Sequence, residues 1–278
     1  TTNSCAVPVY KTSSYVFNDT EHAANLFGLR ELGNIYTRLM NPTTDVLEQR
    51  VTALDGGAAA LGLASGTSGV FYSIINIAQE GDEIVSANNL YGGTYTQFND
   101  ILPKFGIKVN FVDPNDPANY AAAITDKTKA LFCETVSNPG LDVADLEAIA
   151  KIADDHGIPL IVDSTFSTPY LTQPIRHGAS IVIHSLTKWL GGHGNGIGGV
   201  VVDSGSFNWK NGNFPLYDEP DSSYHGLRWG HDLPEPLAPL AFILRMRTVP
   251  LRNLGACISP DNSWQFIQGI ETLSLRME

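Results

Sequence analysis

Short apolar runs that alternate with helical patterns constrain the fold of this chain more than any other feature. The runs are evenly apolar, which is typical of strands buried on both faces of a sheet. We predict strands at residues 58–64, 83–86, 108–112, 130–134, 159–163, 181–184 and 199–202. Helical spacing of apolar residues predicts helices at residues 44–54, 69–79, 94–105 and 143–156. The alternation predicts an α/β fold in which a mostly parallel sheet lies between helices.

Polar residues stand where several of the predicted strands end. Ser65 follows the first strand, residues 134–138 follow the fourth, and Asp163 and Lys188 come at or after the ends of two more. In an open parallel sheet, the ligand crevice lies beyond the carboxyl ends of the strands. We therefore expect these residues to border one binding site.

The segment Ser185-Leu186-Thr187-Lys188 places two hydroxyls and a lysine just after a buried strand. We expect this lysine to lie against an apolar wall instead of bulk water, where desolvation favours the neutral amine that attacks a carbonyl. Ser185 and Thr187 are placed to donate hydrogen bonds to an anionic group. A lysine beside a phosphate-binding group is typical of a pyridoxal phosphate site. An isolated run of this kind is more often a plain strand end.

Ser65-Gly66-Thr67 is a second candidate for binding an anion. The segment opens a helix, so the backbone N–H groups of Gly66 and Thr67 face outward at the positive end of the helix dipole. Such a helix start suits a phosphate group. Taken alone, the same three residues are an ordinary helix cap.

Length, charge and cysteine content exclude several classes of protein. The 278 residues suffice for one large α/β domain or two modest ones. A net charge of -12 opposes binding to nucleic acid or to an anionic membrane surface. No run approaches the ~20 apolar residues of a membrane span, and the first residues do not resemble a signal peptide. Cys5, Cys133 and Cys257 are far apart, which fits a reducing compartment and predicts a cytoplasmic protein.

Two segments lack regular periodicity. Residues 1–40 are rich in Thr, Asn and Tyr, so we expect an arm that lies over another surface. Residues 204–239 are rich in Gly, Asn, Pro and aromatic residues, which predicts a long surface excursion, most simply a loop with packing residues. The final residues, 270–278, have a helical pattern without a stop signal.

Six motifs follow one another along the chain, at residues 36–43, 64–67, 88–93, 134–139, 162–166 and 185–188. In this combination and order, the chain resembles the pyridoxal phosphate enzymes of cysteine and methionine metabolism, a family of fold type I. The resemblance extends over residues 4–278. Segments 25–36, 191–199 and 224–226 are similar to the O-acetylhomoserine sulfhydrylase subgroup, the homocysteine synthases.

The resemblance implies roles for the lysine and the strand-end aspartate. Lys188 would hold the cofactor, be displaced by the amino-acid substrate, and then move protons between the α, β and γ positions. Asp163 would pair with the pyridine nitrogen and keep it protonated. If Lys188 is left out of account, the alternative is that Asp163 is a common strand-end aspartate that caps the following turn. Ser164 departs from the asparagine that is common in the family, so support of the aspartate can differ here.

The same resemblance assigns the remaining site residues. Ser65, Gly66, Thr67, Ser185 and Thr187 would bind the phosphate. Tyr91 would stack on the cofactor and help proton movement when the substrate amine replaces the lysine, and Asn138 would donate to the 3-oxygen. Tyr36 and Arg38 would reach the phosphate of a neighbouring subunit, which requires at least a dimer and commonly a dimer of dimers.

The implied activity is that of a transferase that replaces the acetyl group of O-acetylhomoserine with sulfide to form homocysteine. Alternatives within the family are cystathionine γ-synthase and methionine γ-lyase, which differ in the nucleophile that enters. The expected partners are these small molecules and other copies of the chain, and neither nucleic acid nor membrane. A nucleotide-binding oxidoreductase is a distant alternative.

The resemblance also implies a division of the chain into an arm at 1–42, a cofactor-binding large domain at 43–258, and the start of a C-terminal domain at 259–278. In the family, that domain supplies the arginine for the substrate α-carboxylate. We expect most of it to lie outside this sequence. A catalytically incomplete fragment, with an assembly or regulatory role, is therefore a second hypothesis.

Two tempting motifs are not assigned a function. Residues 194–199 match the G-x-G-x-x-G pattern, but they precede a predicted strand instead of opening a helix, so a dinucleotide site is not predicted. The seven histidines lack the spacing of metal ligands, and His184 in an apolar strand is expected to be a core residue. No metal is predicted.

Overall fold

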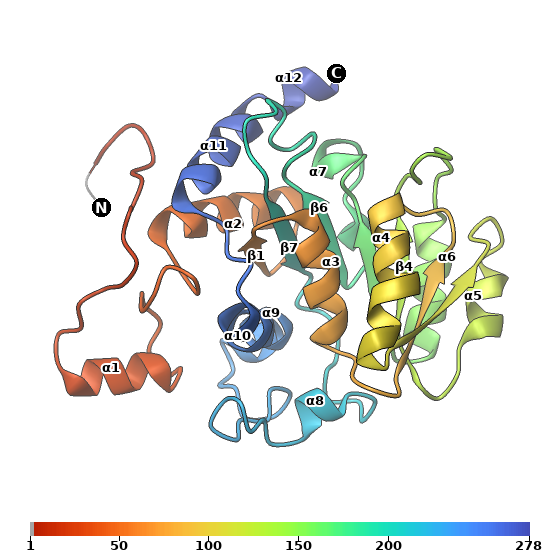
Figure 1. Cartoon of the computed structure of the whole chain (residues 1–278), viewed down its shortest axis with the longest axis horizontal. Coiled ribbons are helices and arrows are strands. Elements are labelled where there is room, and N and C mark those ends of the chain that lie inside the picture. Colours follow the sequence, from red (N-terminus) through yellow and green to blue (C-terminus); the bar gives the residue numbers. More distant parts are fainter. Residues whose placement is uncertain (1–2) are drawn as a thin grey trace.

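A seven-stranded sheet forms the centre of the protein in the computed structural model, which describes residues 3–278 (Figure 1). The strands are β1 (Ala59–Leu63), β2 (Glu83–Ala87), β3 (Lys108–Val112), β4 (Thr128–Glu134), β5 (Leu160–Asp163), β6 (Ile181–Ser185) and β7 (Gly199–Asp203). Their spatial order is β1-β7-β6-β5-β4-β2-β3. β7 is antiparallel to both of its neighbours, and the other pairs are parallel. The predicted mostly parallel sheet is confirmed.

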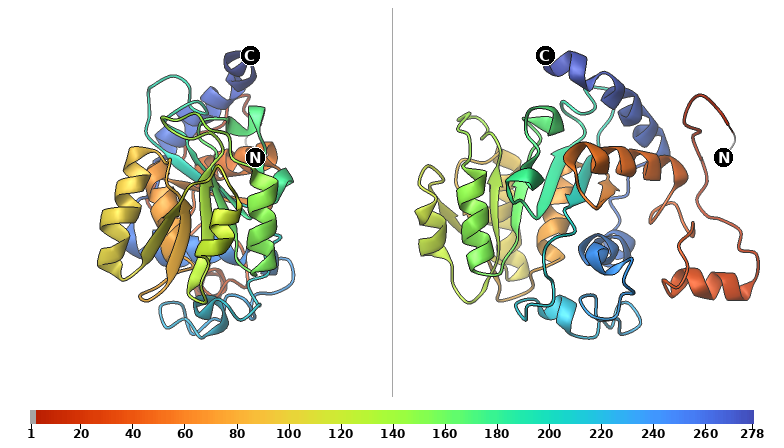
Figure 2. Two further views of the ribbon diagram at one scale, coloured as in Figure 1. Left: turned by 90° about the vertical axis from the view of Figure 1, so that its right-hand side faces the viewer. Right: turned by 180° about the vertical axis from the view of Figure 1, so that it is seen from behind.

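Helices cover both faces of this sheet, so the fold has three layers (Figure 2). α3 (Gly66–Ile75) and α4 (Gly92–Thr96) lie on one side, and α6 (Leu146–Asp155) and α7 (Thr168–Leu171) lie on the other. α2 (Pro42–Asp55) packs against β1 and β7. The other helices are α1 (Thr20–Phe27), α5 (Ala118–Ala123), α8 (Pro215–Asp218), α9 (Ala241–Met246), α10 (Arg252–Leu254), α11 (Pro260–Glu271) and α12 (Leu273–Met277). Within residues 3–278, no helix has the length and apolar character needed to cross a membrane.

The central strands are buried over nearly their whole length, which explains their uninterrupted apolar sequences. All seven residues of β4 are buried, and Leu160, Ile161 and Val162 of β5 are 0% exposed. Full burial of such a side chain contributes roughly 1.5–3 kcal/mol. Because helices cover both faces of the sheet, these strands have no solvent side and need no polar alternation.

Local signals set the limits of the helices. Asn41 caps α2 by accepting a hydrogen bond from the N–H of Thr43, and Pro42 occupies the first helical position. α2 ends at Gly56, whose φ of 72° lies in the left-handed region that glycine adopts without strain. Asp145 caps α6 in the same way as Asn41 caps α2. Capping and burial therefore specify the same alternation of strands and helices.

The helix predicted at residues 94–105 is interrupted in the structure. α4 continues into a π-helical segment, η1 (Gln97–Ile101), and then into a 3₁₀ segment, η2 (Leu102–Phe105). Pro103 has no N–H to donate to the helical ladder, and Gly106 ends the segment with a φ of 76°. The further short segments are η3 (Pro174–His177), η4 (Ala238–Leu240) and η5 (Arg247–Leu251).

Residues 204–239 are not a simple surface excursion. Trp209, Phe214 and Tyr217 are at most 5% exposed, and Trp209 stacks on both Tyr217 and Phe242 of α9. The ring centroids are 4.5 Å and 5.4 Å apart in these two pairs. The expectation of packing residues is confirmed, but the surface location is wrong for these side chains. Their packing partner lies in a later segment, which local periodicity does not reveal.

Residues 3–40 form an arm that extends from one end of the molecule, with α1 at its far end (Figure 1). Near its junction with α2, the arm is attached through Thr43, whose hydroxyl donates to Pro8 O and accepts the N–H of Tyr10. Further out, the side chains of Val16 and Leu32 are 96% and 67% exposed. The arm therefore presents apolar side chains that this chain does not cover.

The aromatic cluster of residues 204–239 should contribute strongly to stability. Trp209→Ala should lower the free energy of unfolding by about 3–5 kcal/mol, because it leaves a cavity between Tyr217 and Phe242. Urea denaturation would measure the change. Trp189→Ala is the matched control, since Trp189 is 48% exposed and should cost much less. Equal, small losses in both variants would contradict the cluster's role.

Candidate cofactor site

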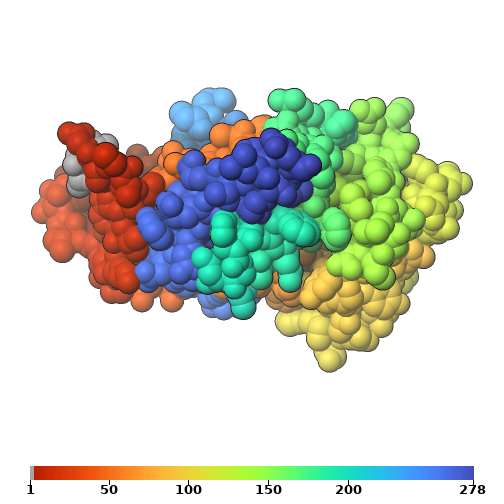
Figure 3. Space-filling view, turned by 90° about the horizontal axis from the view of Figure 1, so that it is seen from above, coloured from red at the N-terminus to blue at the C-terminus, as the bar shows by residue number. Residues whose placement is uncertain are grey.

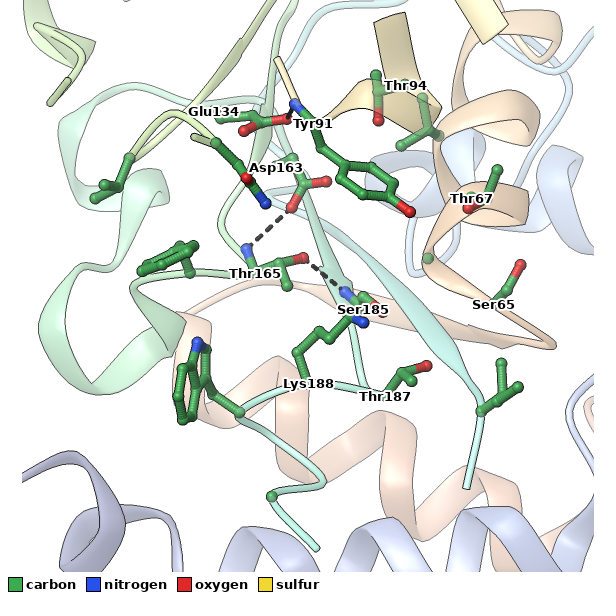
Figure 4. A pocket seen from close by; sticks show the side chains of 18 of the residues that line it. Ser65, Thr67, Tyr91, Thr94, Glu134, Asp163, Thr165, Ser185, Thr187 and Lys188 are labelled. Carbon is green, nitrogen blue, oxygen red and sulfur yellow. Dashed lines mark hydrogen bonds between the residues drawn. The ribbon is translucent and has the colours of Figure 1, made fainter. Parts of the chain in front are cut away.

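A cavity of about 610 Å³ opens where β4, β5 and β6 end and α3 begins. Its volume lies within the roughly 300–1,000 Å³ that is usual for small-molecule sites. Of the eleven site residues predicted from the sequence, nine line this cavity (Figure 4). They are Ser65, Gly66, Thr67, Tyr91, Asn138, Asp163, Ser185, Thr187 and Lys188. Tyr36 and Arg38 are not among the lining residues.

Lys188 and Asp163 border the same cavity from neighbouring strands (Figure 4). Asp163 is the last residue of β5, and Lys188 stands on the turn that follows β6. The two strands are parallel, with Asp163 opposite Ile183, so both residues emerge at one edge of the sheet. The expectation that Lys188 is shielded from bulk water is wrong within this chain, because the turn beyond the strand end leaves Lys188 exposed.

Hydrogen bonds fix the position of Asp163. Its Oδ1 accepts the N–H of Thr165 at 2.9 Å, and Thr165 Oγ1 accepts the N–H of Ser185 at 2.8 Å. Burial raises the pKa of Asp163, whereas the hydrogen bonds from Thr165 and the charge of His184 act in the opposite direction. These contacts tie the end of β5 to the end of β6 and orient the carboxylate at the cavity.

The amino end of α3 faces the cavity with backbone donors. The Ser65 hydroxyl caps the helix by accepting the N–H of Ser68 at 3.0 Å. The N–H groups of Gly66 and Thr67 belong to the first turn, which has no intrahelical acceptors for them. A Cβ at position 66 would lie 2.7 Å from the Ser185 Cβ, so glycine is required for α3 to approach β6 this closely. The N–H groups at the start of α3 and the Ser185 hydroxyl at the end of β6 thus form one group of donors.

The turn that carries Lys188 is held on several sides. Thr187 Oγ1 donates to Gly198 O at 3.2 Å and accepts the N–H of Gly198 at 3.1 Å. Arg276 of α12 donates to Trp189 O at 2.6 Å. In the view from above, the C-terminal helices lie beside this turn (Figure 3). The lysine therefore stands on an anchored segment and not on a free loop.

Glu134 is a site residue to which the sequence assigned no role. It ends β4 directly opposite Asp163 and lines the cavity. Its carboxyl group accepts the N–H of Tyr91 at 2.7 Å and also a backbone hydrogen bond from Asn138. Burial, reinforced by the charge of Asp163, raises the pKa of Glu134 to about 8. Glu134 is therefore largely neutral at pH 7, and it links the loops that carry Tyr91 and Asn138.

One side of the cavity is apolar. Phe166 and Trp189 form an edge-to-face pair with ring centroids 6.5 Å apart near Lys188. The remaining lining residues, to which the sequence assigned no individual role, are Val70, Thr94, Val136, Thr165, Gly192, Gly194 and Ile197. Val70 and Thr94 lie on α3 and α4, and the other five lie on loops, so their approach to the cavity depends on the tertiary fold.

Tyr36 and Arg38 lie on the arm, where the Arg38 guanidinium is 5.1 Å from the centroid of the Tyr36 ring. Arg38 Nε is buried and has no hydrogen-bond partner within residues 3–278. A single chain does not bring these two residues to its own cavity.

The remaining motifs lie as follows. Residues 194–199 lead into β7 and do not open a helix. His184 is fully buried in β6, as expected of a core residue. In the described part of the chain, no group of three or more His, Cys, Asp or Glu side chains could hold a metal ion.

The donor set fits a flat aromatic ring with an anionic tail. A carboxylate and an amine stand at adjacent strand ends, while helix N–H groups and hydroxyls gather at Gly66, where a side chain would fill the space. This arrangement defines an α/β protein that binds a phosphorylated aromatic cofactor beside a lysine. The profile of the family described as Cys/Met metabolism PLP-dependent enzyme matches residues 1–278, so the chain belongs to that family. The resemblance inferred from the motifs is confirmed.

Individual relatives agree with this membership. The O-acetyl-L-homoserine sulfhydrylase of Leptospira meyeri is 57% identical over 282 residues, which cover 100% of this chain and 64% of the relative. The O-acetyl-L-homoserine sulfhydrylase 1 of Thermus thermophilus is 50% identical, with 100% and 66% covered. The chain therefore spans about two thirds of the length of these relatives.

A solved structure is similar over most of the chain. It is that of a putative O-acetylhomoserine (thiol)-lyase from Campylobacter jejuni, which contains N'-pyridoxyl-lysine-5'-monophosphate. The two share 40% sequence identity, with a TM-score of 0.93 and coverage of 98% of this chain and 67% of the other. A protein with this fold therefore carries a pyridoxyl group on a lysine.

Glu134 should make stability depend on pH. In the folded protein it keeps its proton up to about pH 8, whereas its ordinary pKa is 4.5, so the folded state binds more protons between these values. The contribution of Glu134 to the free energy of unfolding should fall as pH rises through this window, by at most about 1.4 kcal/mol per pH unit. Glu134→Gln should flatten the measured dependence in the cofactor-free protein. An identical slope in the wild type and the variant would contradict the raised pKa.

Proposed function

We propose that this chain binds pyridoxal phosphate in the cavity and belongs to a transferase that replaces the acetyl group of O-acetylhomoserine with sulfide, giving homocysteine for methionine and cysteine biosynthesis. The observation that carries the proposal is that Lys188 and Asp163 border one cavity beside the amino end of α3. Two relatives with 57% and 50% identity are named O-acetyl-L-homoserine sulfhydrylases, which supports this reaction.

Lys188 and Asp163 would perform the central tasks. Pyridoxal phosphate, when bound, supplies an electron-withdrawing ring that stabilises negative charge on the carbon next to the substrate amine. Lys188 Nζ would hold the cofactor and would move protons between the substrate carbons. Among the residues that line the cavity, it is the one lysine, so both tasks fall to it. Asp163 binds the protonated ring nitrogen and stabilises its charge.

The other lining residues would hold and orient the cofactor. The phosphate-binding group would comprise Ser65, Gly66, Thr67, Ser185 and Thr187, which supply backbone and hydroxyl donors. Thr187 would donate its hydroxyl proton to the phosphate by giving up its hydrogen bond to Gly198 O. Tyr91 would stack on the ring and assist proton movement, and Asn138 would donate to the 3-oxygen. Glu134 supports both by accepting hydrogen bonds from their backbones.

The site would be completed by a second copy of the chain. The exposed arm and the partnerless Arg38 Nε support an assembly in which Tyr36 and Arg38 reach the phosphate bound by a neighbour. A homodimer is the minimum, and we propose a tetramer formed by two such dimers. The division into an arm at 1–42, a cofactor domain at 43–258 and a C-terminal segment at 259–278 belongs to this proposal. The three free cysteines fit a cytoplasmic location.

Product analysis tests the reaction. The purified protein with pyridoxal phosphate, O-acetylhomoserine and sulfide should release homocysteine and acetate. Lys188→Ala should abolish both products and the visible absorption of the lysine-bound cofactor, whereas Lys151→Ala, on the surface of α6, should keep them. Cystathionine formed from cysteine, or deamination in water, would instead indicate a γ-synthase or a γ-lyase. Cofactor binding without turnover of any substrate would favour the second hypothesis, a catalytically incomplete fragment with an assembly or regulatory role.

Mixing two variants tests the shared site. Arg38→Ala should weaken cofactor binding by roughly tenfold or more, because a bidentate guanidinium contact with phosphate is lost. If Arg38 serves a neighbour's cavity, the Lys188 and the Arg38 that complete one cavity come from two different chains. A mixed dimer of the Arg38→Ala and Lys188→Ala variants then has one cavity in which both residues are present. Refolding the two variants together should therefore restore a fraction of intact sites, measured as recovered visible absorption per chain. No recovery in the mixture, with each variant folded, would place Arg38 and Lys188 in one chain's site.

A further inference from the structure

An aspartate and a histidine form a fully buried pair behind the cavity. Asp55, the last residue of α2, and His184 of β6 are both 0% exposed, and Asp55 Oδ2 lies 2.8 Å from His184 Nε2. The other ring nitrogen, Nδ1, lies 3.2 Å from the carbonyl oxygen of Ser164. Neither residue lines the cavity, and the reaction proposed above does not use them.

The hydrogen-bond partners indicate a charged histidine. A backbone carbonyl can only accept, so Nδ1 must carry a proton. A second proton lies between Nε2 and Asp55 Oδ2, which are 2.8 Å apart. Burial opposes the positive charge, but Asp55, Asp163 and the Ser164 carbonyl together outweigh it and raise the pKa of His184.

The pair is poorly explained by stability alone. Asp55 stands at the carboxyl end of α2, where the helix dipole is unfavourable to a carboxylate. Its Oδ1 is buried, and no group of residues 3–278 donates a hydrogen bond to it. A buried pair of charges is also often no more stabilising than apolar residues of similar volume. A role beyond packing is therefore needed.

The pair is attached to the peptide that follows Asp163. His184 holds the carbonyl of Ser164, and the N–H of Ser164 donates to Ile183 O at 2.8 Å, so β6 grips both sides of this residue. The charge of His184 also lowers the pKa of Asp163 against the effect of burial. The other ionisable groups around Asp163 include Cys133 and Glu134 of β4 and Lys188 on the turn after β6.

We propose that Asp55 and His184 are a positioning pair for Asp163: the fixed imidazolium orients the end of β5 and keeps the Asp163 carboxylate ionised for the ring nitrogen of the cofactor. Asp55 holds the imidazolium in its charged form, and His184 acts on Asp163 through space and through Ser164. The inference rests on the proposed function, because it needs Asp163 as the partner of the ring nitrogen.

The test compares cofactor affinity with folding in the purified protein. Titration with pyridoxal phosphate should give a dissociation constant roughly tenfold or more higher for His184→Gln than for the wild type, because the Asp163 carboxylate loses a nearby positive charge that favours its ionised form. The difference should narrow as pH rises, because Asp163 with a raised pKa regains its charge at higher pH. A loss of affinity that is independent of pH would show a merely structural role and overturn the proposal.

A double variant separates charge from packing. Asp55→Asn combined with His184→Gln leaves no unpaired buried charge, so thermal unfolding of the cofactor-free protein should return close to the wild-type temperature. Its affinity should still show the loss and the pH dependence of His184→Gln. Wild-type affinity in the folded double variant would overturn the proposal. His156→Gln, an exposed histidine at the end of α6, is the matched control and should change neither quantity.

Two further measurements complete the test. Nitrogen-15 NMR of histidine-labelled wild-type protein needs no variant. Both ring nitrogens of His184 should stay protonated at pH values above the ordinary histidine pKa of about 6.5, and a neutral ring at pH 7 would overturn the proposal.

The Asp163→Asn variant distinguishes a failure of the proposed function from a failure of the positioning pair. If it binds the cofactor like the wild type, the proposed function fails; if it weakens binding while His184→Gln does not, the positioning pair alone fails.

Discussion

The parallel pairing of β4, β5 and β6 is the constraint on which the site depends. In this register, Glu134 lies opposite Asp163, and Asp163 lies opposite Ile183, so three strand ends deliver their polar residues to one edge. Side chains alternate between the faces of a sheet, and a slip of one residue would turn Asp163 away from the cavity. The register is held by apolar residues that are buried on both faces, such as Phe132 and Ile161. The chemistry of the site is therefore secured by the packing of the core beneath it.

The surroundings of the two carboxyl groups at this edge, Glu134 and Asp163, determine the pKa of each. Two carboxyl groups face each other across β4 and β5, and burial with mutual repulsion leaves Glu134 protonated near neutral pH. Asp163 differs because Thr165 donates to it and because His184 stands behind it. Burial raises the pKa of both carboxyl groups, and the hydrogen bonds from Thr165 and the charge of His184 oppose this effect at Asp163. The Glu134 carboxyl group accepts hydrogen bonds from the backbone N–H groups of Tyr91 and Asn138.

Much of the sheet and most of the cavity could be predicted from the sequence. Buried parallel strands have local apolar runs, and their ends fall at Asp163 and before Lys188, so topology rules brought these residues together in advance. Features that depend on distant contacts were not predictable in this way. The burial of Trp209 depends on Phe242, and the support that Glu134 gives to Tyr91 joins two different loops. The exposure of Lys188 follows from the turn beyond β6, whereas the sequence pattern described only the strand before it.

The antiparallel course of β7 also determines how the lysine turn behaves. Because β7 runs back beside β6, Ser185 and Gly199 are paired, and the turn between them begins and ends on adjacent strands about 5 Å apart. The loop is thus closed by the sheet itself, with the Thr187 and Gly198 contacts bracing its interior. The conformational entropy of closure is lost when the protein folds and not when a ligand arrives. A molecule entering the cavity meets a segment that is already ordered, so association need immobilise little more than the lysine side chain.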